Sequence, residues 1–194
     1  MNAPSKDLTL TREEWTWDIP EDFNIGSACS DRQVNASNGT QIAMIVEDDD
    51  LGTSSITYQE LADKTSCFAE VIKNLGLDQQ ARVLVRLPNC LYYPVAFLGA
   101  MKAGNIAVPT STLLTAKEVV YLAKDSQASV LVTDLDTWKS LEPMAGELTS
   151  LKTVYIHNVT HDISNDFIAV KSLDVEMDKI EIITPNPITK EIDP

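Results

Sequence analysis

The amino-acid sequence predicts an α/β fold, with a doubly wound, mainly parallel β-sheet flanked by helices. Two observations lead to this prediction. From about residue 57 onward, segments with helical spacing alternate with short strand-like segments. The strand-like segments are nearly continuous runs of Val, Ile and Leu, which is typical of strands buried on both faces of a parallel sheet.

The composition is that of a globular acidic protein. Of 194 residues, 44% are hydrophobic, which is enough to bury a core in one large domain or two small ones. A formal net charge of −14 without a Lys/Arg cluster argues against nucleic acid and anionic membranes as partners. No secretory signal or membrane anchor is recognisable, so we expect a cytoplasmic protein without a membrane span. Cys29, Cys67 and Cys90 lie far apart and predict neither disulfides nor a zinc motif.

Within the first 48 residues, a clear secondary-structure pattern appears only at the end. Residues 1–22 are polar and acidic, and we expect an N-terminal arm whose Trp15 and Trp17 pack on the domain. Residues 23–34 have weak helical spacing. Residues 41–48, QIAMIVED, predict a buried strand.

An acidic turn follows this strand. Residues 48–50 are three aspartates, and we interpret them as a solvated hairpin tip, because no second carboxylate cluster is spaced to complete a metal site. Residues 52–55, GTSS, resemble a phosphate loop only superficially, since they contain no lysine. A hairpin turn is the better interpretation.

A helix is predicted over residues 57–76. Thr57 and Glu60 form the T-x-x-E pattern of a capping box, in which the hydroxyl and the carboxylate satisfy free N–H groups of the first turn. Apolar residues recur at spacings of three and four, and Gly76 stands where a left-handed C-terminal cap is expected.

The centre of the chain predicts a β-α-β unit. Residues 82–87, RVLVRL, are strand-like and are terminated by Pro88. Residues 91–103 are apolar nearly all round, yet too short to span a bilayer, which indicates a helix packed on both sides. Gly99 and Gly104 allow close approach of neighbouring backbone. The excess of apolar surface indicates a packing neighbour outside this chain.

The same alternation continues to about residue 158, and it includes a second capping box at Thr115 and Glu118. The expected elements are a strand at 106–109, a helix from 115, a strand at 129–134, a weaker helix around Trp138 and Leu141, and a strand at 153–158. We expect one α/β subdomain over residues 23–178, followed by a linker over residues 179–194.

Ligands of parallel sheets bind beyond the carboxyl ends of the strands, so the loops at 88–90, 109–112 and 133–134 are the places to look. Asn89, Thr110 and Ser111 are the candidates for lining a substrate or coenzyme cleft there. No G-x-G-x-x-G, phosphate-loop or G-x-S-x-G pattern occurs, so we expect no catalytic residue and no self-contained active site.

Two further candidates are weaker. His157 and His161 have i, i+4 spacing, but His157 ends a strand and no Cys or acidic ligand is spaced with them, so a metal site is disfavoured. Cys90 lies in a strand-to-helix loop without an identifiable His partner, and a packed cysteine is the simpler interpretation.

Three segments together resemble the N-terminal part of adenylate-forming, AMP-binding acyl-CoA synthetases. They are DFNIGSACSDR at 22–32, ITYQELADKTSCFAEVIKNLGL at 56–77, and the run from RVLVRLPNC to SVLVTD at 82–134. The resemblance extends in order over about residues 19–157. It is strongest to the acyl- and aryl-CoA ligase branch, including benzoate-CoA-ligase-like and medium-chain acyl-CoA synthetases.

The resemblance implies a parent enzyme that converts a carboxylic acid and ATP to an acyl-adenylate, and then transfers the acyl group to coenzyme A. ATP, Mg²⁺ and coenzyme A are the implied cofactors. The family's phosphate loop, catalytic lysine and other catalytic motifs would lie beyond Pro194, so this fragment alone is expected to be inactive and to bind none of them. We also expect it to self-associate through the face that would pack on the missing subdomain.

Two alternatives remain open. One is a free-standing α/β binding or interaction module that kept the scaffold without its chemistry. The other is a parent enzyme that adenylates an acid for a different acceptor, such as a carrier-protein thiol or an amine. Nothing before residue 194 separates the second from a CoA ligase except the overall similarity.

Overall fold

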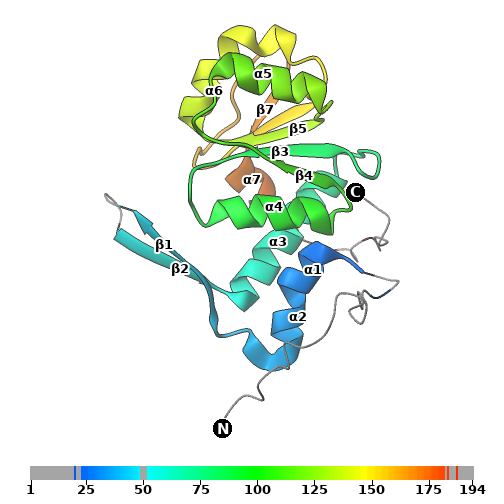
Figure 1. Ribbon diagram of the computed structural model, residues 1–194, viewed down its shortest axis with the longest axis vertical. Helices are drawn as coiled ribbons and strands as arrows, with labels where there is room; N and C mark the ends of the chain where they lie inside the picture. The colour runs from blue at the N-terminus through cyan, green and yellow to red at the C-terminus, as the bar shows by residue number, and fades with distance from the viewer. Residues whose placement is uncertain (1–19, 21–22, 49–51, 182, 184–186, 188–194) are drawn as a thin grey trace, which may run out of the picture.

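A computed structural model describes residues 20, 23–48, 52–181, 183 and 187 and confirms the α/β fold (Figure 1). Its centre is a five-stranded sheet in the order β4-β3-β5-β6-β7, with all neighbouring strands parallel. The strands are β3 (Arg82–Arg86), β4 (Ile106–Pro109), β5 (Val130–Thr133), β6 (Thr153–Ile156) and β7 (Ala169–Ser172).

Helices cover both faces of the sheet. One face packs on α3 (Tyr58–Lys73), α4 (Tyr92–Lys102) and α7 (Leu173–Asp178). The other packs on α5 (Ala116–Asp125), α6 (Leu135–Leu141) and the 3₁₀ helix η2 (Glu142–Glu147). Figure 1 shows these two layers above and below the strands. Along β3, Val83 and Val85 point into the first core and Leu84 into the second, as the two-residue period of a strand requires.

The chain winds in opposite directions from β3. It passes through α4 on one face to β4 at the edge of the sheet, then through α5 on the other face back to β5. The strand order therefore reverses between β3 and β5. In open α/β sheets this reversal opens a crevice at the carboxyl ends of the two strands.

Both predicted capping boxes are present. At the start of α3, Thr57 N donates to Glu60 Oε2 (2.8 Å) and Glu60 N donates to Thr57 Oγ1 (3.2 Å). Thr115 and Glu118 make the same pair of contacts at the start of α5. Gly76 has φ +61°, as the predicted left-handed cap requires.

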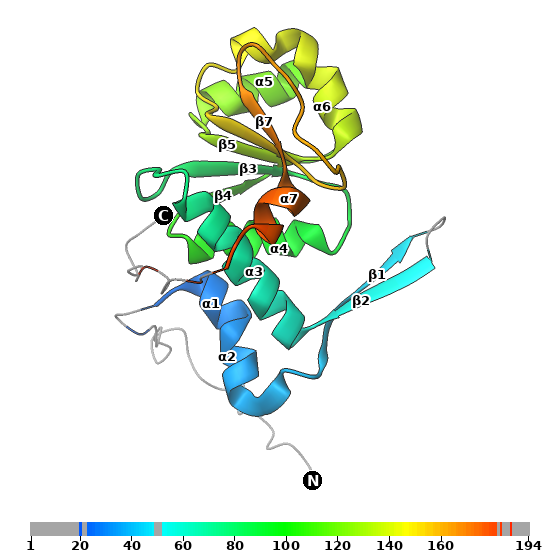
Figure 2. The ribbon, with the colours of Figure 1, turned by 180° about the vertical axis from the view of Figure 1, so that it is seen from behind.

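The prediction of a buried strand at 41–48 is wrong in one respect. A strand is present, β1 (Ile42–Asp48), but it pairs only with β2 (Gly52–Thr57), in a separate antiparallel hairpin that projects from the body (Figure 2). Ile42 and Ile45 are 56% and 62% exposed. The run is apolar, yet no other strand of the described chain pairs with it, so only part of it is covered.

The weak helical spacing near residue 23 corresponds to three short turns. They are α1 (Ile25–Cys29), α2 (Asp31–Gln33) and the π-helical turn η1 (Val34–Asn38). Asn24 caps α1, because its Oδ1 accepts from Ser27 N (3.0 Å). Its Nδ2 donates to the carbonyls of Met101 (3.1 Å) and Pro187 (3.1 Å). One side chain thus joins α1, the end of α4 and the C-terminal segment.

The predicted close approach at Gly99 is confirmed. A Cβ atom there would lie 2.8 Å from the carbonyl oxygen of Thr65, so α4 approaches α3 with no room for a side chain. Gly26 of α1 is equally tight, since its Cβ would lie 2.4 Å from the carbonyl oxygen of Leu98. The apolar helix is covered by α1 and α3 on one side and by the sheet on the other. The packing neighbours of this helix thus lie within the chain, and its apolar surface does not require the neighbour outside the chain that the sequence led us to expect.

Lys102, the single charge in this apolar run, is fully buried. Its Nζ donates to Asp31 Oδ1 (2.8 Å), Ser66 Oγ (3.0 Å) and the carbonyl of Ala62 (3.2 Å). Burial lowers the pKa of Lys102, and the hydrogen bond and charge of Asp31 oppose that shift. These contacts tie α4 to both α2 and α3.

Residues 158–178 contain elements that the sequence pattern did not predict. β7 is a four-residue edge strand and α7 a six-residue helix, both too short for periodicity to distinguish. Trp15, Trp17, Asp49, Asp50 and most of the expected arm and linker lie outside the described residues. In the described part of the chain, no helix combines the length and the apolar character that crossing a membrane needs.

We predict that Asp31→Ala lowers the free energy of unfolding by about 3 kcal/mol, because it leaves the buried Lys102 ammonium without its counter-charge. Lys102→Met removes the charge itself and should cost less. Urea denaturation of the three proteins measures the difference.

Asp136→Ala is the matched control, because Asp136 forms an exposed 3.5 Å ion pair with Lys139 and its loss should cost about 0.5 kcal/mol or less. Equal losses for Asp31→Ala and Asp136→Ala would contradict the role assigned to Lys102.

Candidate functional site

The carboxyl ends of β3, β4 and β5 lie at one edge of the sheet, because the strands are parallel. The loop that leaves β4, residues 110–114, folds back over the end of β3. Thr110 N donates to the carbonyl of Val85 (3.0 Å), and Thr110 Oγ1 lies 3.4 Å from the same oxygen. The loop then leads directly into α5.

Arg86, the last residue of β3, binds the rest of this loop. Its Nη1 donates to the carbonyl of Ser111, and its Nη2 donates to the carbonyls of Thr112 (3.0 Å) and Leu114 (2.8 Å). Arg86 is only 6% exposed. Burial lowers its pKa, and the nearby carboxylate of Asp134 opposes that shift. A buried guanidinium thus organises a backbone turn at the point where the strand order reverses.

The three residues expected to line a cleft lie at this edge. Thr110 is half-buried against β3, and Ser111 is exposed, with its hydroxyl accepting from Leu113 N (3.1 Å). Asn89 is exposed in the turn that follows β3. Their role in binding stays a prediction, because the structure contains no ligand to test it.

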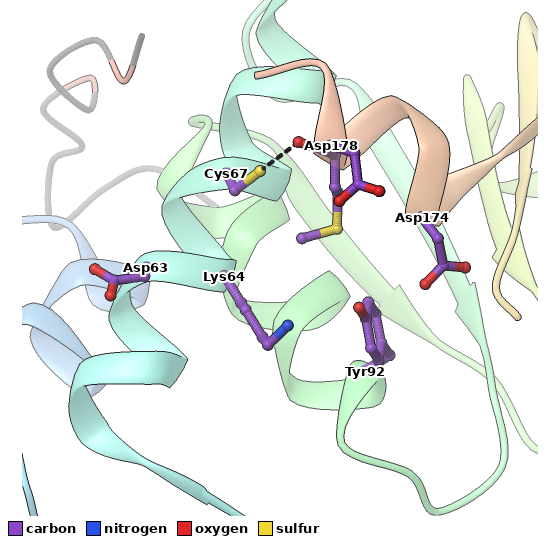
Figure 3. Close-up of a pocket in the computed structure, with 7 residues that line it drawn as sticks. Asp63, Lys64, Cys67, Tyr92, Asp174 and Asp178 are labelled. Carbon is purple, nitrogen blue, oxygen red and sulfur yellow. Dashed lines mark hydrogen bonds between the residues drawn. The ribbon is translucent and has the colours of Figure 1, made fainter. Parts of the chain in front are cut away.

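A pocket of about 330 Å³ lies beside this edge, between α3, the start of α4 and α7 (Figure 3). Its walls combine three carboxylates, an ammonium, a phenol and a thiol. They are Asp63, Lys64, Cys67, Tyr92, Asp174 and Asp178. Lys64 Nζ lies 5.3 Å from the centre of the Tyr92 ring, in cation–π range.

Tyr92 and Asp174 are fixed by His157, which directly follows β6. The Tyr92 and His157 rings stack with their centres 3.9 Å apart. His157 Nδ1 lies 3.3 Å from Asp174 Oδ2, and the same oxygen accepts a hydrogen bond from Asn158 N (2.7 Å). Burial, followed by the charge of Asp174, raises the pKa of Tyr92 to about 12. The phenol therefore stays protonated and can donate a hydrogen bond near neutral pH.

The pocket chemistry is not that of a metal or nucleophile site. No group of three or more His, Cys, Asp and Glu side chains in the described residues could hold a metal ion. Cys67 donates to the carbonyl of Met177 (3.2 Å), and burial raises the pKa of both Cys67 and Cys90. Both thiols stay protonated, so neither is an activated nucleophile.

Sequence reasoning missed Arg86 and the set of Tyr92, His157 and Asp174. Arg86 had one available signal, since a charge at the end of an otherwise continuous apolar strand must find partners if the strand is buried. The other three residues are separated by up to 82 positions, from 92 to 174, and no spacing pattern connects them.

Comparison with known proteins gives consistent matches. Residues 31–190 match the sequence family described as AMP-binding enzyme. The chain is 33% identical over 139 residues to a benzoate–CoA ligase of Thauera aromatica, covering 71% of this chain and 25% of the ligase. It is 30% identical over 133 residues to a 4-hydroxybenzoate–CoA/benzoate–CoA ligase of Rhodopseudomonas palustris, covering 69% of this chain and 24% of that ligase. The chain thus spans about a quarter of the length of these relatives.

Solved structures agree in fold. A crystal structure of an anthranilate CoA ligase in complex with anthranoyl-AMP superposes with a TM-score of 0.77 at 18% identity, over 91% of this chain and 32% of that chain. A benzoate CoA ligase from Burkholderia xenovorans LB400 superposes with a TM-score of 0.66 at 24% identity, over 86% of this chain and 30% of that chain. At these identities the likeness establishes the fold.

We predict that Asp174 makes stability pH-dependent. Burial alone would raise its pKa, but the close contact with His157 and the hydrogen bond from Asn158 outweigh burial, and the pKa is lowered. A lowered folded-state pKa stabilises the fold above the unfolded value of about 3.9, and this contribution is lost as the pH falls through the folded value. The free energy of unfolding of the wild type should exceed that of Asp174→Asn by about 1 kcal/mol at pH 6, and the gap should shrink as the pH falls below the unfolded pKa of about 3.9.

Urea denaturation across this pH range measures the gap, with Asp178→Asn as the control from the exposed rim of the same pocket. A gap between wild type and Asp174→Asn that stays constant from pH 6 to pH 3 would contradict this assignment.

Proposed function

Because this chain belongs to the AMP-binding enzyme family, we propose that it is the first α/β subdomain of an ATP-dependent carboxylic acid–CoA ligase. The whole enzyme would join a carboxylic acid to ATP as an acyl-adenylate, with release of pyrophosphate. Coenzyme A would then displace AMP to give the thioester. The match over residues 31–190 carries the proposal, supported by two relatives that are both named CoA ligases.

Within such an enzyme, this chain would form one wall of the acyl or coenzyme A pocket. Asn89, Thr110 and Ser111 would line that wall at the carboxyl edge of the sheet. The proposed layout keeps an arm over residues 1–22, the α/β subdomain over residues 23–178, and a linker over residues 179–194. We also propose a cytoplasmic location, which agrees with the three cysteines being free thiols.

The described residues do not fit ATP and Mg²⁺ on their own. The guanidinium of Arg86, the buried cation at the cleft, is bound by three backbone carbonyls and has the carboxylate of Asp134 nearby. No acidic cluster in the described part of the chain could hold a metal ion. We therefore assign no step through ATP or Mg²⁺ to these residues, and we propose that the 194-residue chain alone is inactive.

Two measurements on the polypeptide made from its native gene test the proposal. The first is its intact mass, and we expect a value far above 21.4 kDa. The second is ATP–pyrophosphate exchange with a panel of carboxylic acids, followed by thioester formation with coenzyme A. Exchange dependent on one acid, with thioester formation, is the expected result.

Each alternative has its own outcome. A native mass equal to 21.4 kDa would overturn the ligase proposal and leave a free-standing binding module. Exchange without thioester formation, combined with transfer to a carrier-protein thiol or an amine, would identify a different acceptor. The 194-residue chain serves as the control, since it should support no exchange.

We predict that the 194-residue chain self-associates. Its support is the exposed apolar surface of β1, where Ile42 and Ile45 are more than half exposed. Light scattering over a concentration series should show a mass that rises with concentration. Ile42→Thr with Ile45→Thr keeps β-branched residues in the strand and should reduce the association. A constant monomer mass in the wild type would contradict the prediction.

A further inference from the structure

We propose that Arg86 is a positioning residue of the cleft wall, because it holds the loop of residues 110–114 in the one conformation that presents Ser111 and Leu113 outward. The inference rests on the proposed function, since the cleft is that of the proposed ligase. It adds a residue that neither the sequence motifs nor the resemblance singles out.

The contacts of the loop support this role. Three hydrogen bonds run from the guanidinium to the carbonyls of Ser111, Thr112 and Leu114. The planar fork of arginine can reach several acceptors at fixed angles, whereas a lysine ammonium acts as a point charge. The carbonyls of a short turn have few backbone donors available, and Arg86 supplies the donors from the strand beside it.

Arg86 is itself held in place by the sheet. Its carbonyl accepts from Thr133 Oγ1 of β5 (3.1 Å), and β3 is paired on both sides by β4 and β5. The side chain is 6% exposed. A loop anchored to a buried side chain on a central strand takes on the rigidity of that strand, which favours a well-defined binding surface.

The residue at the tip of this loop has no packing reason to be apolar. Leu113 is 91% exposed, while its backbone N–H is held by the Ser111 hydroxyl (3.1 Å). An apolar side chain presented to solvent by an ordered turn is suited to contact an organic substrate in the cleft. Arg86 would act on binding only through this loop.

The first test is amide hydrogen exchange measured by NMR on the 194-residue chain. Arg86→Leu should speed exchange at Thr110, Leu113 and Leu114 by about tenfold or more, because charge-assisted hydrogen bonds are lost. Arg82→Leu is the matched control, since it removes the same side chain from the exposed, opposite end of β3. Arg86→Lys should give an intermediate result.

The second test uses the full polypeptide from the native gene. Arg86→Leu and Leu113→Ala should each raise KM for the same organic substrate, acid or coenzyme A, by about tenfold, with kcat and the KM for ATP within about threefold of wild type. A purely structural role would instead lower the active fraction, and so kcat, without selecting one substrate. Leu113→Ala keeps the test independent of folding, because a 91% exposed side chain contributes little to the core.

Distinct outcomes separate the two proposals. Exchange in Arg86→Leu that matches Arg82→Leu overturns the positioning role, and so does an active wild type in which Arg86→Leu changes no KM. A wild type without any pyrophosphate exchange overturns the proposed function, and with it the substrate-binding part of this inference.

Discussion

The buried ammonium of Lys102 is the interaction on which the arrangement of the helices depends. A fully buried lysine is tolerated only when acceptors surround it, and Asp31, Ala62 and Ser66 come from two other helices. The apolar helix α4 can therefore occupy only one position relative to α2 and α3. Gly26 and Gly99 make the same demand sterically, because each sits where no Cβ atom fits. The N-terminal helices α1 and α2 thus hold α4 in its position.

A second constraint operates at the opposite end of the sheet. Parallel strands bring the loops after β3, β4 and β5 to one edge, and Arg86 at the end of β3 binds the loop after β4 through its backbone carbonyls. The edge is consequently well ordered, although it offers little chemistry of its own. The Arg86 guanidinium is already hydrogen-bonded to backbone carbonyls, and burial keeps the thiols of Cys67 and Cys90 protonated. The described residues contain no cluster that could hold a metal ion.

The pocket beside that edge shows how the tertiary structure adds chemistry that spacing does not reveal. Tyr92, His157 and Asp174 follow three different strands, yet stacking and a 3.3 Å contact join them into one unit. The hairpin β1–β2 shows the reverse case. Its apolar sequence is typical of a buried strand, but burial depends on what lies opposite, and only β2 pairs with β1 in the described chain.

The sequence by itself determined the fold class, the four helices and strands from residue 57 to residue 109, both capping boxes and the close approach at Gly99. These features depend on local periodicity, on hydrogen bonds three residues apart and on the absence of a side chain, all of which are written in neighbouring residues. Only the tertiary structure decided the exposure of β1, the presence of β7 and α7, and the partners of Lys102, Arg86 and His157. Each of these depends on groups that are far apart in the chain and meet only when the sheet and its helices have assembled.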